Sequence, residues 1–311
     1  MILCVCLNPA LDVTYGVTEL TYGGTHRAQV VGRRAGGKAL NVARVLHQLG
    51  EPVLATGLAG GADGGAVLAD LAELGVAAEF AEIEGESRRT VTVYDGRQAT
   101  EFDEVGPVVG EAEWGSFRSL YTRLLAGATV VVISGSQPPG VPVDAYAELT
   151  TLAAAAGATV VLDAAGPALR AALAARPDVV KPNRLELAEL VGRTLDDLDD
   201  LDDLLAASGT LVEAGAGSVL VSLGADGLVA LTPGGAFRVR LPAPVAGNPT
   251  GAGDALAAAV VRGLRRGDDW PSCLVDGVAV AAASVAVGQA GATDEALVAQ
   301  LRPTVQLEKL R

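Results

Sequence analysis

The sequence predicts an α/β fold, in which a mostly parallel β-sheet carries helices on both faces and a small second sheet accompanies it. Three observations support this prediction. Short apolar runs alternate with segments of helical periodicity along most of the chain. These runs are continuous in Val, Ile and Leu, which is typical of strands covered on both faces. Two segments interrupt the alternation with the pattern of paired strands that have no helix between them.

The elements of the parallel sheet follow a regular order along the chain. Apolar runs predict strands at 1–7 (MILCVCL), 53–58 (VLATGL), 129–134 (TVVVIS), 159–164 (TVVLDA) and 218–223 (SVLVSL). Helical periodicity predicts helices at 41–50 and 65–75. Because parallel strands need crossover connections, we expect the helices to lie against the faces of the sheet.

The second sheet is predicted from two hairpin-like segments. Residues 12–34 contain two strand patterns, and residues 88–103 alternate around Asp95-Gly96, which is a strong hairpin-turn signal. Segments of about 12–34 and 88–107 are therefore expected to form a small β-sheet lid, inserted into a single domain that spans 1–311. The acidic run at 195–205 (LDDLDDLDDLL) predicts a solvated helix rather than a binding tail.

Composition excludes several classes of function. The net charge is −14 and no basic run exceeds two residues, which argues against binding to nucleic acid or to an anionic membrane. Three cysteines are too few for a disulfide framework. The N-terminus has no signal-peptide pattern and no apolar run approaches the length of a membrane span, so we expect a cytoplasmic protein.

The glycine-rich segment GNPTGAGDAL (247–256) is the strongest local signal. Asp254 leads into an apolar helical pattern, and Gly251, Ala252 and Gly253 directly precede it. Unpaired N–H groups and the positive dipole end of a helix N-terminus favour an anion. A carboxylate at that place either caps the helix or acts chemically beside the anion.

Other motifs are weaker when taken singly. GRRAGGK (32–38) has the spacing of a phosphate loop, but Ala39 follows where magnesium coordination needs Ser or Thr, and GLAGGADGG (57–65) lacks the dinucleotide-binding spacing. SGSQPPG (134–140) is expected as a loop over the carboxyl end of the sheet, where ligands of α/β proteins bind. In KPNRLEL (181–187) the Asn and Glu three residues apart suit a helix capping pair as well as a site, and SLGADG (222–227) suits a hairpin turn.

In this order the motifs resemble those of the ribokinase-like carbohydrate kinases, in the branch of 1-phosphofructokinase and tagatose-6-phosphate kinase. The resemblance runs from LNPALD (7–12) through GGKALNVARVL (36–46), SGSQPPG, VKPNRLE and SLGADG to PTGAGDAL. It implies a three-layer ribokinase-like core, ATP as co-substrate with Mg²⁺, and phosphoryl transfer to a sugar hydroxyl.

The resemblance also implies roles for individual residues. Asp254 would be the general base, and the N–H groups of Gly251, Ala252 and Gly253 an anion hole for the transferring phosphoryl group. The sugar would be bound by Asp12, expected at the end of the first strand, and by Gly36, Gly37, Lys38 and Asn41. The nucleotide would be bound by Lys181, Asn183, Ser222, Gly224, Gly227 and Thr250. Glu186 and Asn183 would hold Mg²⁺ through water.

A substrate that already carries phosphate needs fixed cations, and arginine suits phosphate oxygens. The chain has such cations near the expected lid: Arg27, Lys38, Arg88 and Arg89. Lys38 and Arg89 are the first candidates and Arg27 the next, and ordinary surface charge is the alternative for Arg88. The family usually has glycine where this chain has Ala39, and relatives often have asparagine where it has Val91. Both departures concern the identity of the sugar phosphate.

The expected reaction converts fructose 1-phosphate to fructose 1,6-bisphosphate, with tagatose 6-phosphate and fructose 6-phosphate as the next candidate acceptors. A kinase for an unphosphorylated sugar or a nucleoside is the alternative enzyme, and a sugar-phosphate sensor without catalysis is the alternative outside enzymes. Pairing of lids would bury exposed sheet edges, so we expect a homodimer.

Overall fold

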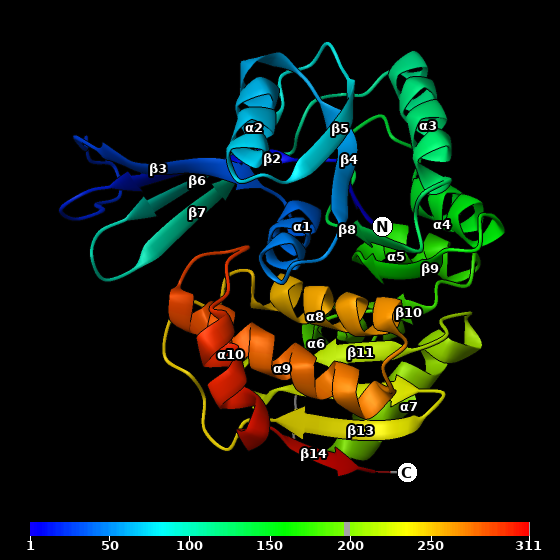
Figure 1. The fold of residues 1–311 in the computed structure, drawn as a ribbon. Helices are drawn as coiled ribbons and strands as arrows, with labels where there is room; N and C mark the ends of the chain where they lie inside the picture. The colour runs from blue at the N-terminus through cyan, green and yellow to red at the C-terminus, as the bar shows by residue number, and fades with distance from the viewer. Residues whose placement is uncertain (196–199, 311) are drawn as a thin grey trace.

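A computed structural model describes residues 1–195 and 200–310, and its framework is a large sheet with the strand order β14-β13-β12-β11-β10-β9-β8-β1-β4-β5 (Figure 1). The strands from β5 to β11 in this order run parallel, and β11 to β14 are antiparallel. These strands are β1 (Ile2–Cys6), β4 (Val53–Ala59), β5 (Ala77–Glu82), β8 (Val130–Ser134), β9 (Thr159–Asp163), β10 (Val179–Val180), β11 (Val219–Ser222), β12 (Leu228–Thr232), β13 (Gly235–Arg240) and β14 (Gln306–Lys309).

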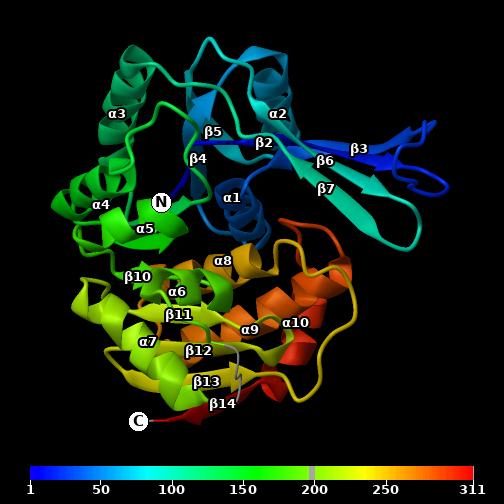
Figure 2. The ribbon, with the colours of Figure 1, turned by 180° about the vertical axis from the view of Figure 1, so that it is seen from behind.

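Helices cover both faces of this sheet and enclose two apolar cores (Figures 1 and 2). One face carries α1 (Lys38–Gln48), α8 (Ala252–Arg266), α9 (Trp270–Val287) and α10 (Glu295–Leu301). The other carries α3 (Glu111–Leu125), α4 (Ala145–Ala155), α5 (Gly166–Leu173), α6 (Arg184–Val191) and α7 (Leu201–Glu213). α2 (Gly61–Glu73) packs between β5 and the small sheet, and short 3₁₀ turns occur at η1 (Gly224–Asp226) and η2 (Arg302–Thr304).

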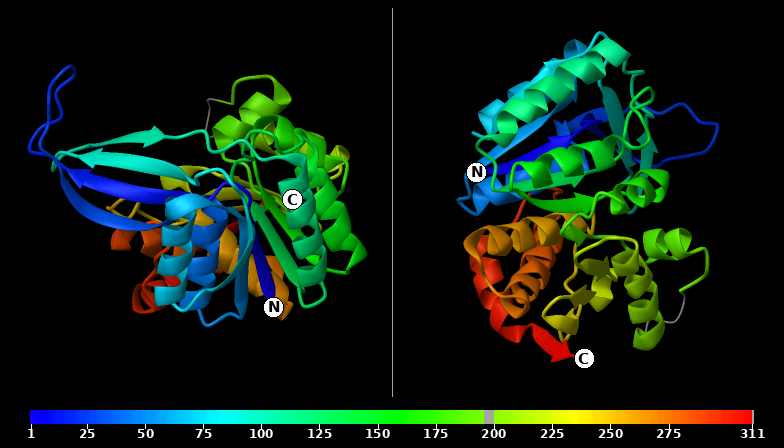
Figure 3. Two further views of the ribbon diagram at one scale, coloured as in Figure 1. Left: turned by 90° about the horizontal axis from the view of Figure 1, so that it is seen from above. Right: turned by 90° about the vertical axis from the view of Figure 1, so that its right-hand side faces the viewer.

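The second sheet has the strand order β3-β2-β6-β7 and projects away from the large sheet (Figure 3). Its strands are β2 (Ala10–Gly16), β3 (Gln29–Gly36), β6 (Arg88–Tyr94) and β7 (Ala99–Asp103). The central pair, β2 and β6, is parallel, and the outer strands pair antiparallel with them. One expectation was wrong: Asp12 does not end the first strand, because β1 stops at Cys6 and Asp12 lies inside β2.

The α/β fold class and the separate small sheet are confirmed. The strands and helices expected from the apolar runs are present, with ends shifted by a few residues. Of the acidic run at 195–205, residues 196–199 lie outside the described residues, and α7 begins at Leu201.

The expectation that no apolar segment approaches the length of a membrane span was wrong for α9. By length and composition alone, this helix could cross a membrane. In the structure α9 packs against α8 and β13, and three of its own side chains, Leu274, Val278 and Val280, are buried in the core. These contacts are those of a core helix.

Candidate active site

Asp254 occupies the first turn of α8 and is buried. Its Oδ2 accepts a hydrogen bond from Asn41 Nδ2 of α1 at 2.7 Å. Burial raises the pKa of Asp254 to about 6, the negative charge of Asp163 adds to this, and the Asn41 hydrogen bond and two lysines oppose it. A carboxylate with a pKa near 6 is ionised at neutral pH and can still accept a proton, which suits a general base.

The backbone before Asp254 leaves two amide donors free. Gly251 is the N-cap of α8 with φ of 81°, in the left-handed region that favours glycine, and the N–H of Ala252 donates to the Pro249 carbonyl at 3.1 Å. Within the described chain, the N–H groups of Gly251 and Gly253 have no acceptor. A Cβ on Gly253 would lie 3.4 Å from Lys181 Nζ, so this N-terminus lies beside a fixed cation.

Asp163, the last residue of β9, joins two lysines at this place. Its side chain is buried, with Oδ2 2.9 Å from Lys181 Nζ and Oδ1 3.4 Å from Lys38 Nζ. The two ammonium groups keep the pKa of Asp163 low despite its burial. Because Lys38 starts α1 and Lys181 follows β10, one buried carboxylate fixes two cations from separate elements near Asp254.

The Asn183–Glu186 pair is a capping box at the start of α6. Asn183 Oδ1 accepts from the Glu186 N–H at 2.9 Å, and Glu186 Oε2 accepts from the Asn183 N–H at 2.8 Å. The second oxygen, Oε1, lies 3.5 Å from Lys38 Nζ. The structural and the functional interpretation of this motif are therefore compatible, since the cap holds Glu186 with one oxygen directed to the lysine.

Asp12 lies where the small sheet meets α1, opposite a glycine that makes room for it. A Cβ on Gly36 would lie 2.0 Å from Asp12 Oδ1, so a larger residue there would displace the carboxylate. Burial raises the pKa of Asp12 to about 6, against the lowering effect of Arg44 and Arg88. Gly37 is the N-cap of α1 with φ of 112°, and a Cβ there would lie 2.8 Å from Cys6 Sγ.

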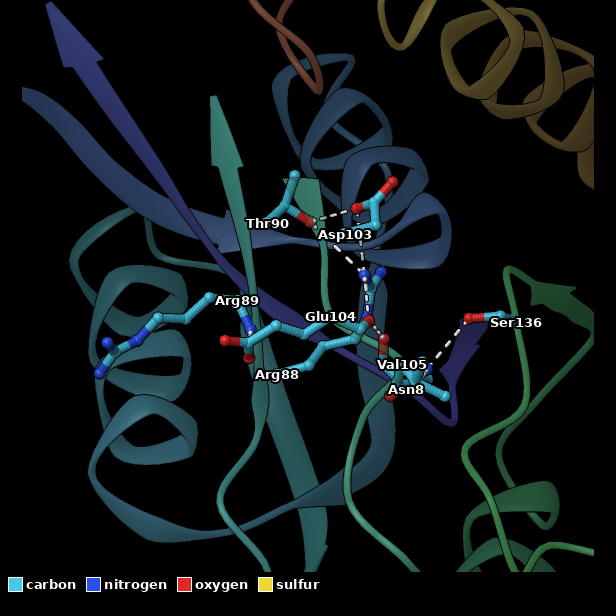
Figure 4. A network of polar contacts seen from close by, with 8 residues as sticks. All are labelled: Asn8, Arg88, Arg89, Thr90, Asp103, Glu104, Val105 and Ser136. Atoms are coloured by element: carbon cyan, nitrogen blue, oxygen red, sulfur yellow. Dashed lines mark hydrogen bonds and ion pairs between the residues drawn. The ribbon is translucent and has the colours of Figure 1, made fainter. Parts of the chain in front are cut away.

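Arg88 and Arg89 point to opposite faces of β6, as successive strand residues do (Figure 4). The Arg88 side chain is only 14% exposed, and its Nε donates to the Asn8 carbonyl at 3.2 Å. Asn8 Nδ2 in turn donates to Ser136 Oγ at 3.1 Å. The Arg89 side chain is 51% exposed and pairs with Asp63 of α2 at 2.5 Å.

The structure therefore places Arg88, and not Arg89, on the face that carries Asp12. Arg88 lies at the start of β6, and Thr90, on the same face, is in register with Asp12 of β2. Strand alternation was the signal that could have separated the two arginines, provided that the buried face of β6 was known.

A cavity of about 390 Å³ adjoins the N-terminus of α8 on the other side. Its walls are mostly apolar, with Leu256 and Val285 among them, and Gly253 lies in its lining. Three of the expected nucleotide-site residues also line it: Ser222, Gly224 and Gly227. Lys181 and the Asn183–Glu186 pair lie outside this lining.

Other expected residues lie elsewhere. Arg27 is exposed in the segment between β2 and β3, and Thr250 is exposed beside the cavity, with its N–H donating to Asn248 Oδ1 at 3.1 Å. Ala39 is fully buried in the core, and Val91 shares the face of β6 that carries Arg89. Sequence reasoning missed Asp163, although its position at the carboxyl end of a parallel strand was a usable signal.

The geometry places a buried carboxylate, free amide donors and two lysines at the N-terminus of α8, next to an apolar cavity. Residues 1–297 match the pfkB family of carbohydrate kinases. The chain belongs to this family. It is a carbohydrate kinase, and the expected resemblance is confirmed.

Solved structures of similar proteins agree with the family. This pfkB-family chain is 28% identical to phosphofructokinase-2 from Escherichia coli in its tetrameric inhibited form, with a TM-score of 0.89 over 97% of this chain and 98% of that one. It is 27% identical to a possible 1-phosphofructokinase from Thermotoga maritima, with a TM-score of 0.87 over the whole of both chains. Arabidopsis thaliana ribokinase, at 22% identity and a TM-score of 0.76 over 97% of this chain and 98% of that one, shows the same fold.

Proposed function

We propose that this kinase transfers the γ-phosphoryl group of ATP to a phosphorylated ketohexose, with fructose 1-phosphate converted to fructose 1,6-bisphosphate as the first candidate reaction. The observation that carries the proposal is the position of Arg88, a largely buried guanidinium on the Asp12 face of the small sheet. Tagatose 6-phosphate and fructose 6-phosphate are the next candidates. One similar structure, E. coli phosphofructokinase-2, was solved in complex with fructose-6-phosphate at 29% identity to this chain.

In the proposed reaction Asp254 accepts the proton of the sugar hydroxyl as its oxygen attacks the γ-phosphorus. The new O–P bond forms while the bond from phosphorus to the bridging oxygen breaks, and that oxygen leaves with ADP. The free N–H groups of Gly251 and Gly253 would donate to the oxygens of the transferring group. Lys38 and Lys181, held by Asp163, add positive charge at the same place.

ATP is proposed to bind with its base in the apolar cavity and its phosphates towards the N-terminus of α8, near Ser222, Gly224, Gly227 and Thr250. The side-chain oxygens of the Asn183–Glu186 pair fit Mg²⁺ bound through water, because Glu186 Oε1 is not used in the cap and oxygen ligands suit this ion. Bound Mg²⁺ would neutralise charge on the β- and γ-phosphates.

The substrate is tested by measuring ADP release with Mg²⁺-ATP and a panel of acceptors. The panel contains fructose 1-phosphate, fructose 6-phosphate, tagatose 6-phosphate, free fructose and ribose. We expect kcat/KM for one phosphorylated ketose to exceed that for the free sugars by at least about 10²-fold, since charge-assisted phosphate contacts are lost without the phosphate. Equal or better turnover of a free sugar would overturn the proposal.

Assembly is proposed to occur through the small sheet, as a homodimer in the cytoplasm. Its outer strands expose apolar side chains, including Val30 and Val31 of β3 and Phe102 of β7, and edge strands carry unpaired backbone groups. Sedimentation at micromolar concentration is expected to give twice the 31.3 kDa chain mass, and Val31→Asp to give the single mass. A single mass for the unsubstituted protein at every concentration would contradict this assembly.

A further inference from the structure

Arg44 is a buried cation that the proposed reaction does not use. It lies on α1, two turns after Lys38, and only 2% of its side chain is exposed. One nitrogen, Nη2, donates to Asn41 Oδ1 at 2.6 Å and to the Ala290 carbonyl at 2.8 Å. Burial lowers the pKa of Arg44 to about 10, and nearby Arg34 acts in the same direction. A guanidinium buried this deeply stays charged at neutral pH, and its desolvation must be offset by the groups it holds.

The contact with Asn41 determines which way the asparagine amide faces. An amide has one accepting oxygen and one donating nitrogen, and arginine can only donate. Arg44 therefore requires the Oδ1 end of Asn41, which leaves the Nδ2 end to donate to Asp254 at 2.7 Å. If the amide turned over, its oxygen would face the Asp254 carboxylate and the hydrogen bond would be lost.

The contact with Ala290 links Arg44 to the N-terminus of α8, which is the other part of the proposed transfer site. Residues 288–294 connect α9 to α10, and a Cβ on Gly251 would lie 2.8 Å from Ala290, so this connection packs against the N-cap of α8. A Cβ on Gly291 would lie 2.5 Å from the Arg44 guanidinium, which shows how closely the connection covers it. Gln48, one turn further along α1, also holds the connection, because its Nε2 donates to the Gly291 carbonyl at 3.1 Å.

We propose that Arg44 is a positioning residue that orients the Asn41 amide towards Asp254 and seats Ala290 against Gly251, so that α1 aligns the base with the amide donors. The inference rests on the proposed function of Asp254. It assigns the residue a role through Asn41 and Ala290, without contact to sugar or nucleotide. Asp70 of α2, with Oδ2 4.0 Å from Arg44 Nη1, supplies the nearest negative charge.

The groups around Asp254 determine in which direction the loss of Arg44 would shift the pKa of this carboxylate. Asp163 of β9 raises the pKa of Asp254, whereas the Asn41 hydrogen bond, Lys181 and Lys38 lower it. Without Arg44 the Asn41 amide is no longer held, and the positive charge that itself interacts with Asp254 is also lost, so two lowering contributions weaken. The pKa of Asp254 then rises, and the acid limb of kcat/KM moves to higher pH.

The test compares Arg44→Met and Arg44→Lys with Gln48→Ala, on whichever acceptor the unsubstituted protein phosphorylates. Arg44→Met is expected to lower kcat by about 10- to 100-fold, since a small misplacement of a catalytic group has effects of this order. Its acid limb should move up by about 0.5–1 pH unit, with KM for ATP changed less than about twofold. Arg44→Lys, which can still donate to Asn41, should recover part of both effects.

Gln48→Ala is the matched control, because it loosens the same connection without touching Asn41. It should leave the acid limb unmoved. An unmoved limb in Arg44→Met, or equal shifts in Arg44→Met and Gln48→Ala, would overturn the inference. If Arg44→Met does not fold, the same comparison is made with Arg44→Lys.

If the unsubstituted protein phosphorylates no sugar in the panel, the proposed function fails, and the inference is judged separately by NMR titration of ¹³C-labelled aspartate. An Asp254 pKa that is higher in Arg44→Met than in the unsubstituted protein supports the inference. Identical titrations refute it.

Discussion

Replacing Asp254 by asparagine is expected to lower kcat by about 10²- to 10⁴-fold, the range that a general base contributes. Asparagine has nearly the same shape and cannot accept the hydroxyl proton, and the buried site has room for it beside Asn41. KM for ATP should change less than about twofold, because the cavity proposed for the nucleotide keeps its lining. The measurement is steady-state ADP release, with thermal unfolding to show that the variant is folded.

The pH profile gives an independent check on the same residue. Burial and Asp163 favour the protonated form of Asp254 and raise its pKa to about 6, so the proposed base is ionised above this value. For the unsubstituted protein, kcat/KM should fall as the pH is lowered through about 6, and the residual activity of Asp254→Asn should lack this limb. An Asp254→Asn variant with near-normal kcat would show that another group takes the proton.

Replacing Arg88 by alanine is expected to lower kcat/KM for the phosphorylated ketose by about 10- to 100-fold, since a hydrogen bond to a charged group contributes about 1.5–3 kcal/mol. The neighbouring Arg89 is the matched control. It has the same side chain one residue away and is likewise paired with a carboxylate, Asp63, as Arg88 is with Asp103. Because Arg89 lies on the opposite face of β6, Arg89→Ala should change kcat/KM less than about threefold.

A free sugar separates phosphate recognition from general damage to the small sheet. With free fructose as acceptor, Arg88→Ala and Arg89→Ala should change kcat/KM to the same extent, because this acceptor has no phosphate that could bind the Arg88 guanidinium. If Arg89→Ala gives the larger loss with the phosphorylated ketose, the phosphate lies on the α2 side of the sheet and the placement of the substrate proposed above is wrong.

Much of this fold was predictable because its physical signals are local. Strands such as 130–134 and 159–163 are buried on both faces, so their apolar runs need no partner to be identified. The hairpin of β6 and β7 was indicated by the Asp95-Gly96 turn. The apolar length of α9 was missed because its alanines and valines are interspersed with small and polar residues.

The candidate site was predictable where the chain itself brings residues together. The segment from Gly251 to Asp254 and the Asn183–Glu186 cap are local motifs of this kind. Asp163 and Arg44 were missed because Asp163 meets Lys38 across 125 residues and Arg44 meets Ala290 across 246 residues. The choice between two adjacent arginines depends on which face of a strand the substrate meets, and a one-residue error reverses that face.

Asn41 and Asp254, joined by one hydrogen bond, are 213 residues apart in the chain. At synthesis rates of about 5–20 residues per second, the ribosome needs on the order of 10–40 s to make the stretch between them. Until α8 emerges, the apolar side of α1 that packs against it has no cover, and Val42, Val45 and Leu46 lie in the core shared with α8. The nascent chain therefore exposes apolar surface of α1 until α8 has been made, and the contact between Asn41 and Asp254 forms only after that.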